Sequence, residues 1–152
     1  MNREIRKLRQ SFECAFRGVL PCLRTERNFR IHITAAVYVS IFALLGGLDA
    51  VRCAILCLCF SGMMSAELMN TAIERSCDRQ ALGYDKLVRE AKDIAAAGVV
   101  VCALFCVLVG SLFFLWEGAL WTAARFFAAH LWAAGLLAVS IPAALLFVFR
   151  FR

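Results

Sequence analysis

The sequence predicts an all-α integral membrane protein with an N-terminal amphipathic surface helix, three transmembrane helices and an additional C-terminal transmembrane helix. Of its 152 residues, 62% are hydrophobic and only 18% are charged, whereas a soluble domain is close to half apolar and a quarter charged. Four apolar runs approach the length that crosses a bilayer core. The chain has only two prolines, and no run alternates strictly as a transmembrane strand does.

Basic residues flank the apolar runs. The chain has 17 Lys and Arg residues and a net charge of +6, with basic residues concentrated in 1–30, in 75–92 and at the C-terminus. Such clusters mark cytoplasmic segments, so residues 49–52 and 117–125 are expected on the outer side. The pattern excludes nucleic acid as a partner. Most of the eight cysteines lie inside apolar runs and are interpreted as reduced packing residues.

Residues 1–30 are predicted to form the surface helix. Apolar residues such as Ile5, Leu8 and Phe12 recur at helical spacing, while basic residues occupy the other positions. A basic amphipathic helix of this kind lies in the plane of the lipid headgroups. Pro21 is expected to end or kink it.

A membrane domain is assigned to residues 1–116, with spans at about 31–48, 51–73 and 94–116. Gly46 and Gly47 predict a short turn after the first span, and a charged connection is expected over 75–92. Residues 117–152 form the extra C-terminal segment, whose span is expected over 126–149. Small residues recur four apart in the second and third spans, which favours close helix packing in lipid.

The second span carries polar residues before it ends. Glu67, Asn70, Glu74 and Asp78 are three or four residues apart, so a helix places them on one face. Glu67 would lie roughly 12 Å deep, where an ionisable residue costs roughly 2.5–3.5 kcal/mol. The alternative is a helix that ends near Leu68, with its acids in solvated headgroups. That helix would have about 16 apolar residues, fewer than a span usually needs.

Acids at this depth suit a divalent cation. Mg²⁺ takes one or two protein carboxylates and completes its shell with waters and phosphates. Glu26 precedes the first span, and Lys92 and Asp93 precede the third, at the same expected level. Phosphoryl transfer needs charge neutralisation, positioning and a base. The chain contains neither a P-loop nor protein-kinase motifs, which excludes the ordinary nucleotide-binding folds.

Three motifs together resemble the prokaryotic diacylglycerol kinase and undecaprenol kinase family. They are TERNFRIH (25–32), ExxNTAIExxxD (67–78) and AKDIAAAGV (91–99), in the family's order and spacing. The resemblance covers roughly residues 5–116. It implies a small kinase of the cell inner membrane, homotrimeric, with active sites shared between neighbouring subunits at the cytoplasmic interface.

The resemblance also implies roles for individual residues. Glu67 would be the general base on the lipid hydroxyl, and Glu26 and Glu74 would hold the Mg²⁺ that bridges the phosphates of ATP. The residues implied at the nucleotide are Asn70, Glu74, Asp78, Lys92, Asp93, Lys7 and Arg17. For Lys7 and Arg17, anchoring of the surface helix in headgroups is the favoured interpretation.

The chain departs from the family pattern in three places. His32 stands where the diacylglycerol kinases usually carry an acid, and ERNFRIH resembles the undecaprenol kinase branch more closely. Cys14 stands near a position where the family often has an aromatic residue against the nucleotide, and the fourth span has no counterpart in the common three-span form.

The sequence therefore predicts ATP- and Mg²⁺-dependent phosphorylation of a membrane lipid alcohol. Undecaprenol is favoured as the acceptor, and diacylglycerol is the alternative. The alternative of another class is a non-enzymatic membrane scaffold or ion-binding subunit.

Overall fold

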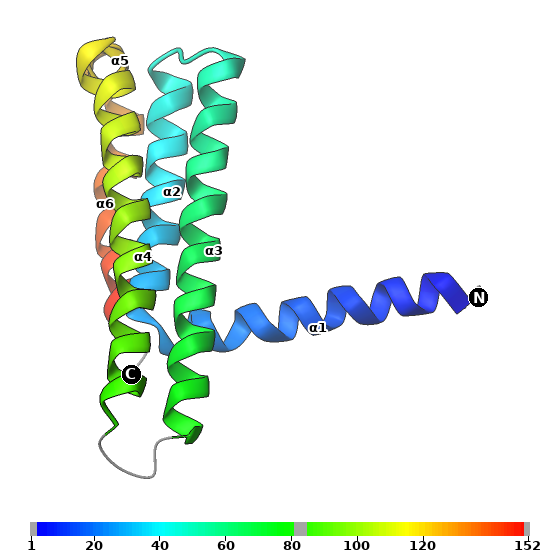
Figure 1. Ribbon diagram of the computed structural model, residues 1–152. Helices are drawn as coiled ribbons and strands as arrows, with labels where there is room; N and C mark the ends of the chain where they lie inside the picture. The colour runs from blue at the N-terminus through cyan, green and yellow to red at the C-terminus, as the bar shows by residue number, and fades with distance from the viewer. Residues whose placement is uncertain (1–2, 81–84, 151–152) are drawn as a thin grey trace.

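A computed structural model describes residues 3–80 and 85–150 of the chain, and within these every regular element is a helix (Figure 1). Four stretches are long and apolar enough to cross a membrane, which confirms the predicted class. They are Arg27–Leu45, Ala50–Arg79, Lys86–Trp116 and Leu131–Phe149. The elements are α1 (Arg3–Thr25), α2 (Arg27–Leu45), α3 (Ala50–Gln80), α4 (Lys86–Ser111), the π-helical η1 (Leu112–Trp116), α5 (Ala119–Ala129) and α6 (Leu131–Phe149).

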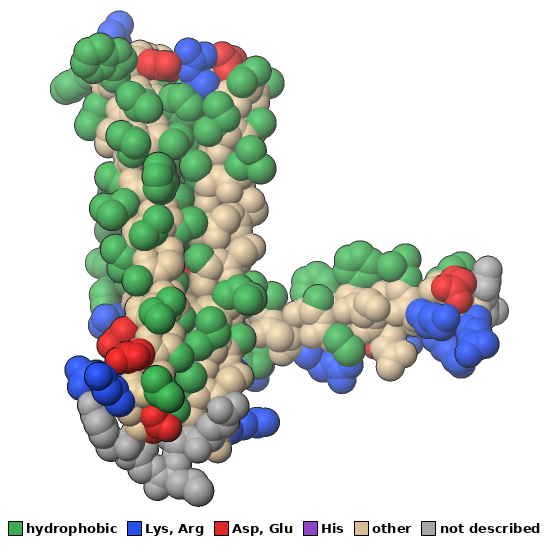
Figure 2. Space-filling model, viewed as in Figure 1, with side chains coloured by type: hydrophobic (Ala, Val, Ile, Leu, Met, Phe, Trp, Pro, Cys, Tyr) green, Lys and Arg blue, Asp and Glu red, His purple; other side chains and the backbone are tan. Residues whose placement is uncertain are grey.

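The first helix projects sideways from the bundle (Figure 1). Figure 2 shows its apolar side chains on the side toward the bundle body and its Lys and Arg residues on the opposite side. Ile5, Leu8 and Phe12 are each more than half exposed. An apolar face on the same side as the spans is the arrangement of a helix lying at a membrane surface.

The boundary between α1 and α2 differs from the expected one. The surface helix does not end at Pro21 but continues to Thr25, and the first span already begins at Arg27. Only Glu26 separates the two helices, with an extended backbone (φ −94°, ψ 108°). The charged connection expected over 75–92 is also mostly helical, because α3 continues to Gln80 and α4 begins at Lys86.

Gly46 and Gly47 follow the end of α2 and allow α5 to pack closely against it. Gly47 has a positive φ of 74°, and its N–H donates to the carbonyl of Leu44 while Leu48 N–H donates to that of Ala43. This pair of hydrogen bonds closes a helix C-terminus around a left-handed residue. A Cβ on Gly46 would lie 2.8 Å from the carbonyl oxygen of Ala119. The missing side chain therefore lets α5 begin directly against the end of α2.

The C-terminal segment returns along α2. The rings of Phe42 and Phe127 lie 5.5 Å apart between centroids, and the hydroxyls of Tyr38 and Ser140 lie 2.9 Å apart farther down. The segment is broken at His130, whose backbone is not helical. The fourth span consequently begins at Leu131 rather than near residue 126.

Burial within this single chain is sparse. Large apolar side chains are exposed over much of the bundle surface (Figure 2), as lipid-facing helices require. Among the described residues, the buried polar side chains are Arg30, Glu67 and Thr71. Arg30 belongs to α2, whereas Glu67 and Thr71 belong to α3. Arg30 lies in the first turn of α2, next to α1, and this end of the bundle holds the candidate site.

Candidate active site

The acidic residues of α3 lie on one uninterrupted helix. It remains helical from Ala50 to Gln80, so the alternative that it ends near Leu68 is wrong. Glu67, Asn70, Glu74 and Asp78 therefore all belong to one continuous helix, and their spacing places them on one face as predicted. The side chain of Glu67 is only 4% exposed, which makes it the most enclosed carboxylate of this face.

A histidine from α2 meets this buried carboxylate. His32 Nε2 lies 3.1 Å from Glu67 Oε1, at ion-pair distance. The two groups are not aligned as a hydrogen bond, and within the described chain Glu67 Oε1 has no hydrogen-bond partner. A buried carboxylate oxygen normally has one. Glu67 is therefore placed to accept a hydrogen bond from a group that is not part of this chain.

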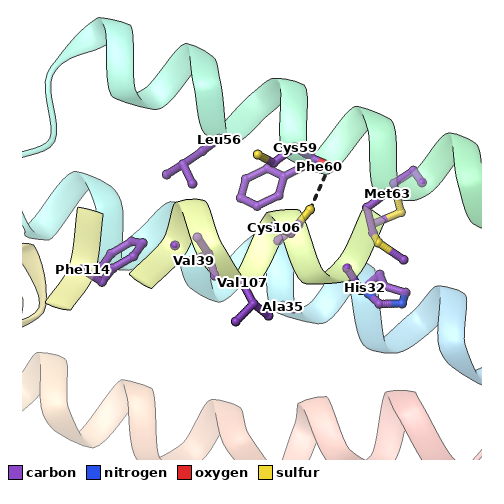
Figure 3. A pocket seen from close by; sticks show the side chains of 14 residues that line it. His32, Ala35, Val39, Leu56, Cys59, Phe60, Met63, Cys106, Val107 and Phe114 are labelled. Atoms are coloured by element: carbon purple, nitrogen blue, oxygen red, sulfur yellow. Dashed lines mark hydrogen bonds between the residues drawn. The ribbon is translucent and has the colours of Figure 1, made fainter. Parts of the chain in front are cut away.

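An apolar cavity of about 280 Å³ is lined at one end by His32 (Figure 3). It lies between α2, α3 and α4, and His32 lines it together with Met63, one turn before Glu67. The remaining lining residues are small or apolar: Ala35, Ala36, Val39, Leu56, Cys59, Phe60, Met64, Ala103, Cys106, Val107, Gly110 and Phe114. The Sγ of Cys106 donates to the carbonyl of Cys59 across the cavity wall. The cavity therefore suits a hydrocarbon chain whose polar end would meet His32.

Beyond Glu67 the face becomes more polar. Asn70 Nδ2 donates to Glu74 Oε1 at 3.0 Å, and Asn70 Oδ1 is buried without a partner in the described chain. Lys92 of α4 forms an ion pair with Asp78 of α3. Its ammonium also interacts electrostatically with Glu74. One cation from α4 thus pairs with an acid of α3.

Glu26 joins the site from the junction between α1 and α2. Its Oε1 lies 2.7 Å from Thr25 Oγ1 and 3.6 Å from Arg75 Nη2. Arg75 Nη2 also donates to Thr25 Oγ1 at 2.9 Å. Arg75 of α3 therefore ties the α1–α2 junction to the third helix.

The carboxylates of this region share one electrostatic environment. Glu26 and Glu74 both interact with Glu67 through their charges. Among the described residues, no three His, Cys, Asp or Glu side chains gather as a ready metal cage. A pair of carboxylates is nevertheless the usual protein contribution to Mg²⁺, whose remaining ligands are waters and phosphates. The donor set therefore fits a metal that arrives with nucleotide.

Three residues expected at the nucleotide lie apart from this group. Asp93 is exposed and lies 3.9 Å from Arg89 of its own helix. Lys7 pairs with Glu4, and Arg17 donates to the carbonyl of Glu13. Lys7 is 18 residues before the end of α1, about 27 Å along a helix. Within one chain it is remote from Glu67.

The sequence interpretation did not place His32 or Arg75 in the site. His32 was noted as a departure from the family pattern, although an ionisable side chain inside a span is itself a signal of function. Arg75 looked like part of the charged connection. Only the packing of α2 and the α1–α2 junction against α3 brings these two side chains to Glu67 and Glu26.

The fold and site together define a small integral-membrane protein in which the buried Glu67 lies beside His32, at the wall of an apolar cavity, and a charged cluster lies farther along α3. Residues 13–114 match the prokaryotic diacylglycerol kinase family, and the chain belongs to this family of lipid kinases. This confirms the resemblance and decides the class against a non-enzymatic scaffold or ion-binding subunit. The helices α5 and α6 lie beyond the matched residues.

Two relatives are similar over most of the chain. The undecaprenol kinase of Bacillus subtilis is 40% identical over 112 residues, which cover 74% of this chain and 91% of that protein. The diacylglycerol kinase of Synechocystis sp. is 40% identical over 106 residues, which cover 69% of this chain and 61% of that protein.

Proposed function

We propose that the protein transfers the γ-phosphoryl group of ATP to a membrane lipid alcohol in a Mg²⁺-dependent reaction, with undecaprenol as the favoured acceptor. The observation that carries the proposal is the position of Glu67. Its buried Oε1 has no hydrogen-bond partner in the described chain and lies beside the residue that ends the apolar cavity. An acceptor hydroxyl at the end of a lipid chain would supply that partner.

The favoured acceptor follows from the cavity lining. Among the described residues that line the cavity, His32 alone has an ionisable nitrogen, and the others are apolar or small (Figure 3). An isoprenoid alcohol carries one hydroxyl on a hydrocarbon chain. Diacylglycerol also brings two ester groups, which would be buried without good donors at a cost in free energy. Diacylglycerol is therefore the second candidate.

Glu67 and the residues around it have separate roles in phosphoryl transfer. Glu67 accepts the proton of the acceptor hydroxyl as its oxygen attacks the γ-phosphorus and ADP leaves. Asn70 holds Glu74 by a hydrogen bond, and Lys92 brings positive charge to the phosphates. Glu26 and Glu74 are the carboxylates that would hold Mg²⁺. When bound, the ion neutralises phosphate charge that would otherwise repel the acidic face.

The proposed topology places this site at the cytoplasmic face of the cell inner membrane. Basic residues concentrate at the α1 end of the bundle, and such residues favour the cytoplasmic side. A homotrimer with shared active sites accounts for the remote basic residues of α1, because Lys7 could then approach the nucleotide of a neighbouring subunit. Asp78 and Asp93 would border that nucleotide.

A competition assay tests this proposal. Purified protein in lipid nanodiscs receives labelled ATP, Mg²⁺ and an equimolar mixture of undecaprenol and diacylglycerol. We expect label chiefly in undecaprenyl phosphate, and none when Mg²⁺ is removed by a chelator. Label chiefly in phosphatidic acid would show that diacylglycerol, and not undecaprenol, is the preferred acceptor. Phosphoryl transfer in the absence of any divalent cation would show that the reaction does not depend on Mg²⁺.

A further inference from the structure

The C-terminal helix reaches the site although it lies outside the residues matched by the family. It follows α2 in the antiparallel direction, with Tyr38 opposite Ser140 and Arg30 opposite Val148. Arg30 is eight residues before Tyr38 on α2, and Val148 is eight residues after Ser140 on α6. The two helices therefore keep the same register between these contacts. The last turn of α6 thereby meets the first turn of α2, beside Glu26.

Arg30 connects the ends of two helices to α2. Its side chain is almost fully buried, with 2% of the residue exposed. Its Nε donates to the carbonyl of Val148 at 3.1 Å, and its Nη1 donates to those of Leu23 and Arg24 at 3.1 and 3.0 Å. These carbonyls belong to the last turns of α6 and α1, where helix carbonyls lack partners within their own helix. A permanent cation there also offsets the negative ends of both helix dipoles.

The same junction determines where Glu26 lies. Glu26 is the single non-helical residue between α1 and α2, and its N–H donates to the carbonyl of Cys22 in the last turn of α1. The place of its side chain therefore depends on how the end of α1 is held against α2. Arg30 holds that end through Leu23 and Arg24.

We infer that Arg30 is a positioning residue for Glu26, and that α6 takes part in this positioning through the carbonyl of Val148. The inference rests on the proposed role of Glu26 toward Mg²⁺. If α6 moves away, a buried guanidinium loses an acceptor and must turn to find another. The end of α1 then shifts with it, and Glu26 leaves its place relative to Glu67 and Glu74.

Two substitutions separate this role from general stability. Arg30→Gln removes the charge and the fork of donors, and Arg27→Gln is its control, an exposed arginine one turn earlier on α2. For Arg30→Gln we expect a roughly tenfold rise in the Mg²⁺ concentration needed for half-maximal binding of a non-hydrolysable ATP analogue. The KM for the lipid should change little, because the cavity is lined by other residues.

The part played by α6 is tested from its own side. Val148→Trp places a large side chain at a buried position, and Phe149→Trp makes a similar change at an exposed neighbour. Hydrogen–deuterium exchange then reports whether peptides covering 21–30 and 143–150 lose protection together. We expect Val148→Trp to loosen both peptides and to raise the Mg²⁺ requirement as Arg30→Gln does, and Phe149→Trp to do neither.

Glu26→Gln distinguishes failure of this inference from failure of the proposed metal site. If Glu26→Gln leaves the Mg²⁺ requirement unchanged, Glu26 is not a metal ligand and both ideas fail. If Glu26→Gln raises it while Arg30→Gln and Val148→Trp do not, the metal site stands and the positioning role is wrong. Should Arg30→Gln fail to fold, Val148→Trp and its exchange pattern still decide the question.

Discussion

His32 Nε2 of α2 lies 3.1 Å from Glu67 Oε1 of α3, at the point where the apolar cavity meets the charged face. Two ionisable groups at lipid depth are costly unless each serves the other or a substrate. Their alignment leaves Glu67 Oε1 without a hydrogen bond in the described chain. His32 therefore places an imidazole nitrogen close to the proposed base without forming a hydrogen bond to that oxygen.

This relationship makes His32→Gln informative. Glutamine keeps a polar group of similar reach but cannot gain or lose a proton as an imidazole can. We expect kcat to fall by about tenfold to a hundredfold and the pH–rate profile to change shape. His130→Gln, at the exposed break between α5 and α6, is the matched control. Identical pH profiles for wild type and His32→Gln would show that His32 does not act on Glu67.

The metal prediction concerns Glu74. Glu74→Gln keeps the hydrogen-bond acceptor for Asn70 but removes the charge, so Mg²⁺-dependent nucleotide affinity should drop at least about tenfold, equal to about 1.4 kcal/mol. Calorimetric titration of an ATP analogue with and without Mg²⁺ measures this. Glu90→Gln, on the surface of α4, should bind like the wild type. Unchanged nucleotide affinity in Glu74→Gln would show that Glu74 is not a ligand of the metal.

Lys92 is expected to serve nucleotide rather than lipid. It pairs with Asp78 and interacts electrostatically with Glu74, so Lys92→Gln should raise the KM for ATP by about tenfold and leave that for the lipid nearly unchanged. Steady-state kinetics with each substrate varied in turn gives the two values. Lys86→Gln provides the control at an exposed position of the same helix. An equal rise in both KM values would speak for a general distortion instead.

The opposite end of the bundle has its own charged group, and it predicts a dependence on pH. The Arg52 backbone N–H donates to Asp49, and together with the Arg52 guanidinium this lowers the pKa of that carboxyl below its ordinary value of 3.8. Arg52 also donates to Glu117 at 3.1 Å, which ties the α2–α3 turn to the start of the C-terminal segment.

A lowered folded pKa means that the charged Asp49 stabilises the fold above pH 3.8 and that this contribution is lost as pH falls through the lower value. The difference in melting temperature between wild type and Asp49→Asn should therefore be largest near neutral pH and shrink on acidification below 3.8. Thermal unfolding in detergent at several pH values measures it. A difference that stays constant into that acidic range would contradict the assignment.

Much of the fold is predictable because local patterns determine it. Apolar runs identify the spans, and three- and four-residue spacing places Glu67, Asn70 and Glu74 on one helical face. Hydropathy did not reveal the break at His130, because the helices on both sides are apolar. Nor did it reveal that a single extended residue, Glu26, separates α1 from α2.

The acidic face of α3 and Lys92 of α4 could be predicted from the sequence, but the partners of Glu67 and Glu26 could not. Carboxylates inside a span stand out in the sequence, whereas the partners of Glu67 and Glu26 come from packing between helices. Arg30 and Val148 are 118 positions apart, and no local pattern joins a guanidinium to a distant backbone carbonyl. Such pairs depend on the register of α6 against α2, which cannot be predicted from the local sequence.

The central claim is that Glu67 is the base for phosphoryl transfer to a lipid hydroxyl. Its most direct test is the rate of phosphate transfer to undecaprenol by purified Glu67→Gln protein that retains its helical signal and its oligomeric state. The account predicts a loss of at least about a hundredfold in kcat, with nucleotide binding retained. A folded Glu67→Gln protein with near-native kcat would contradict it.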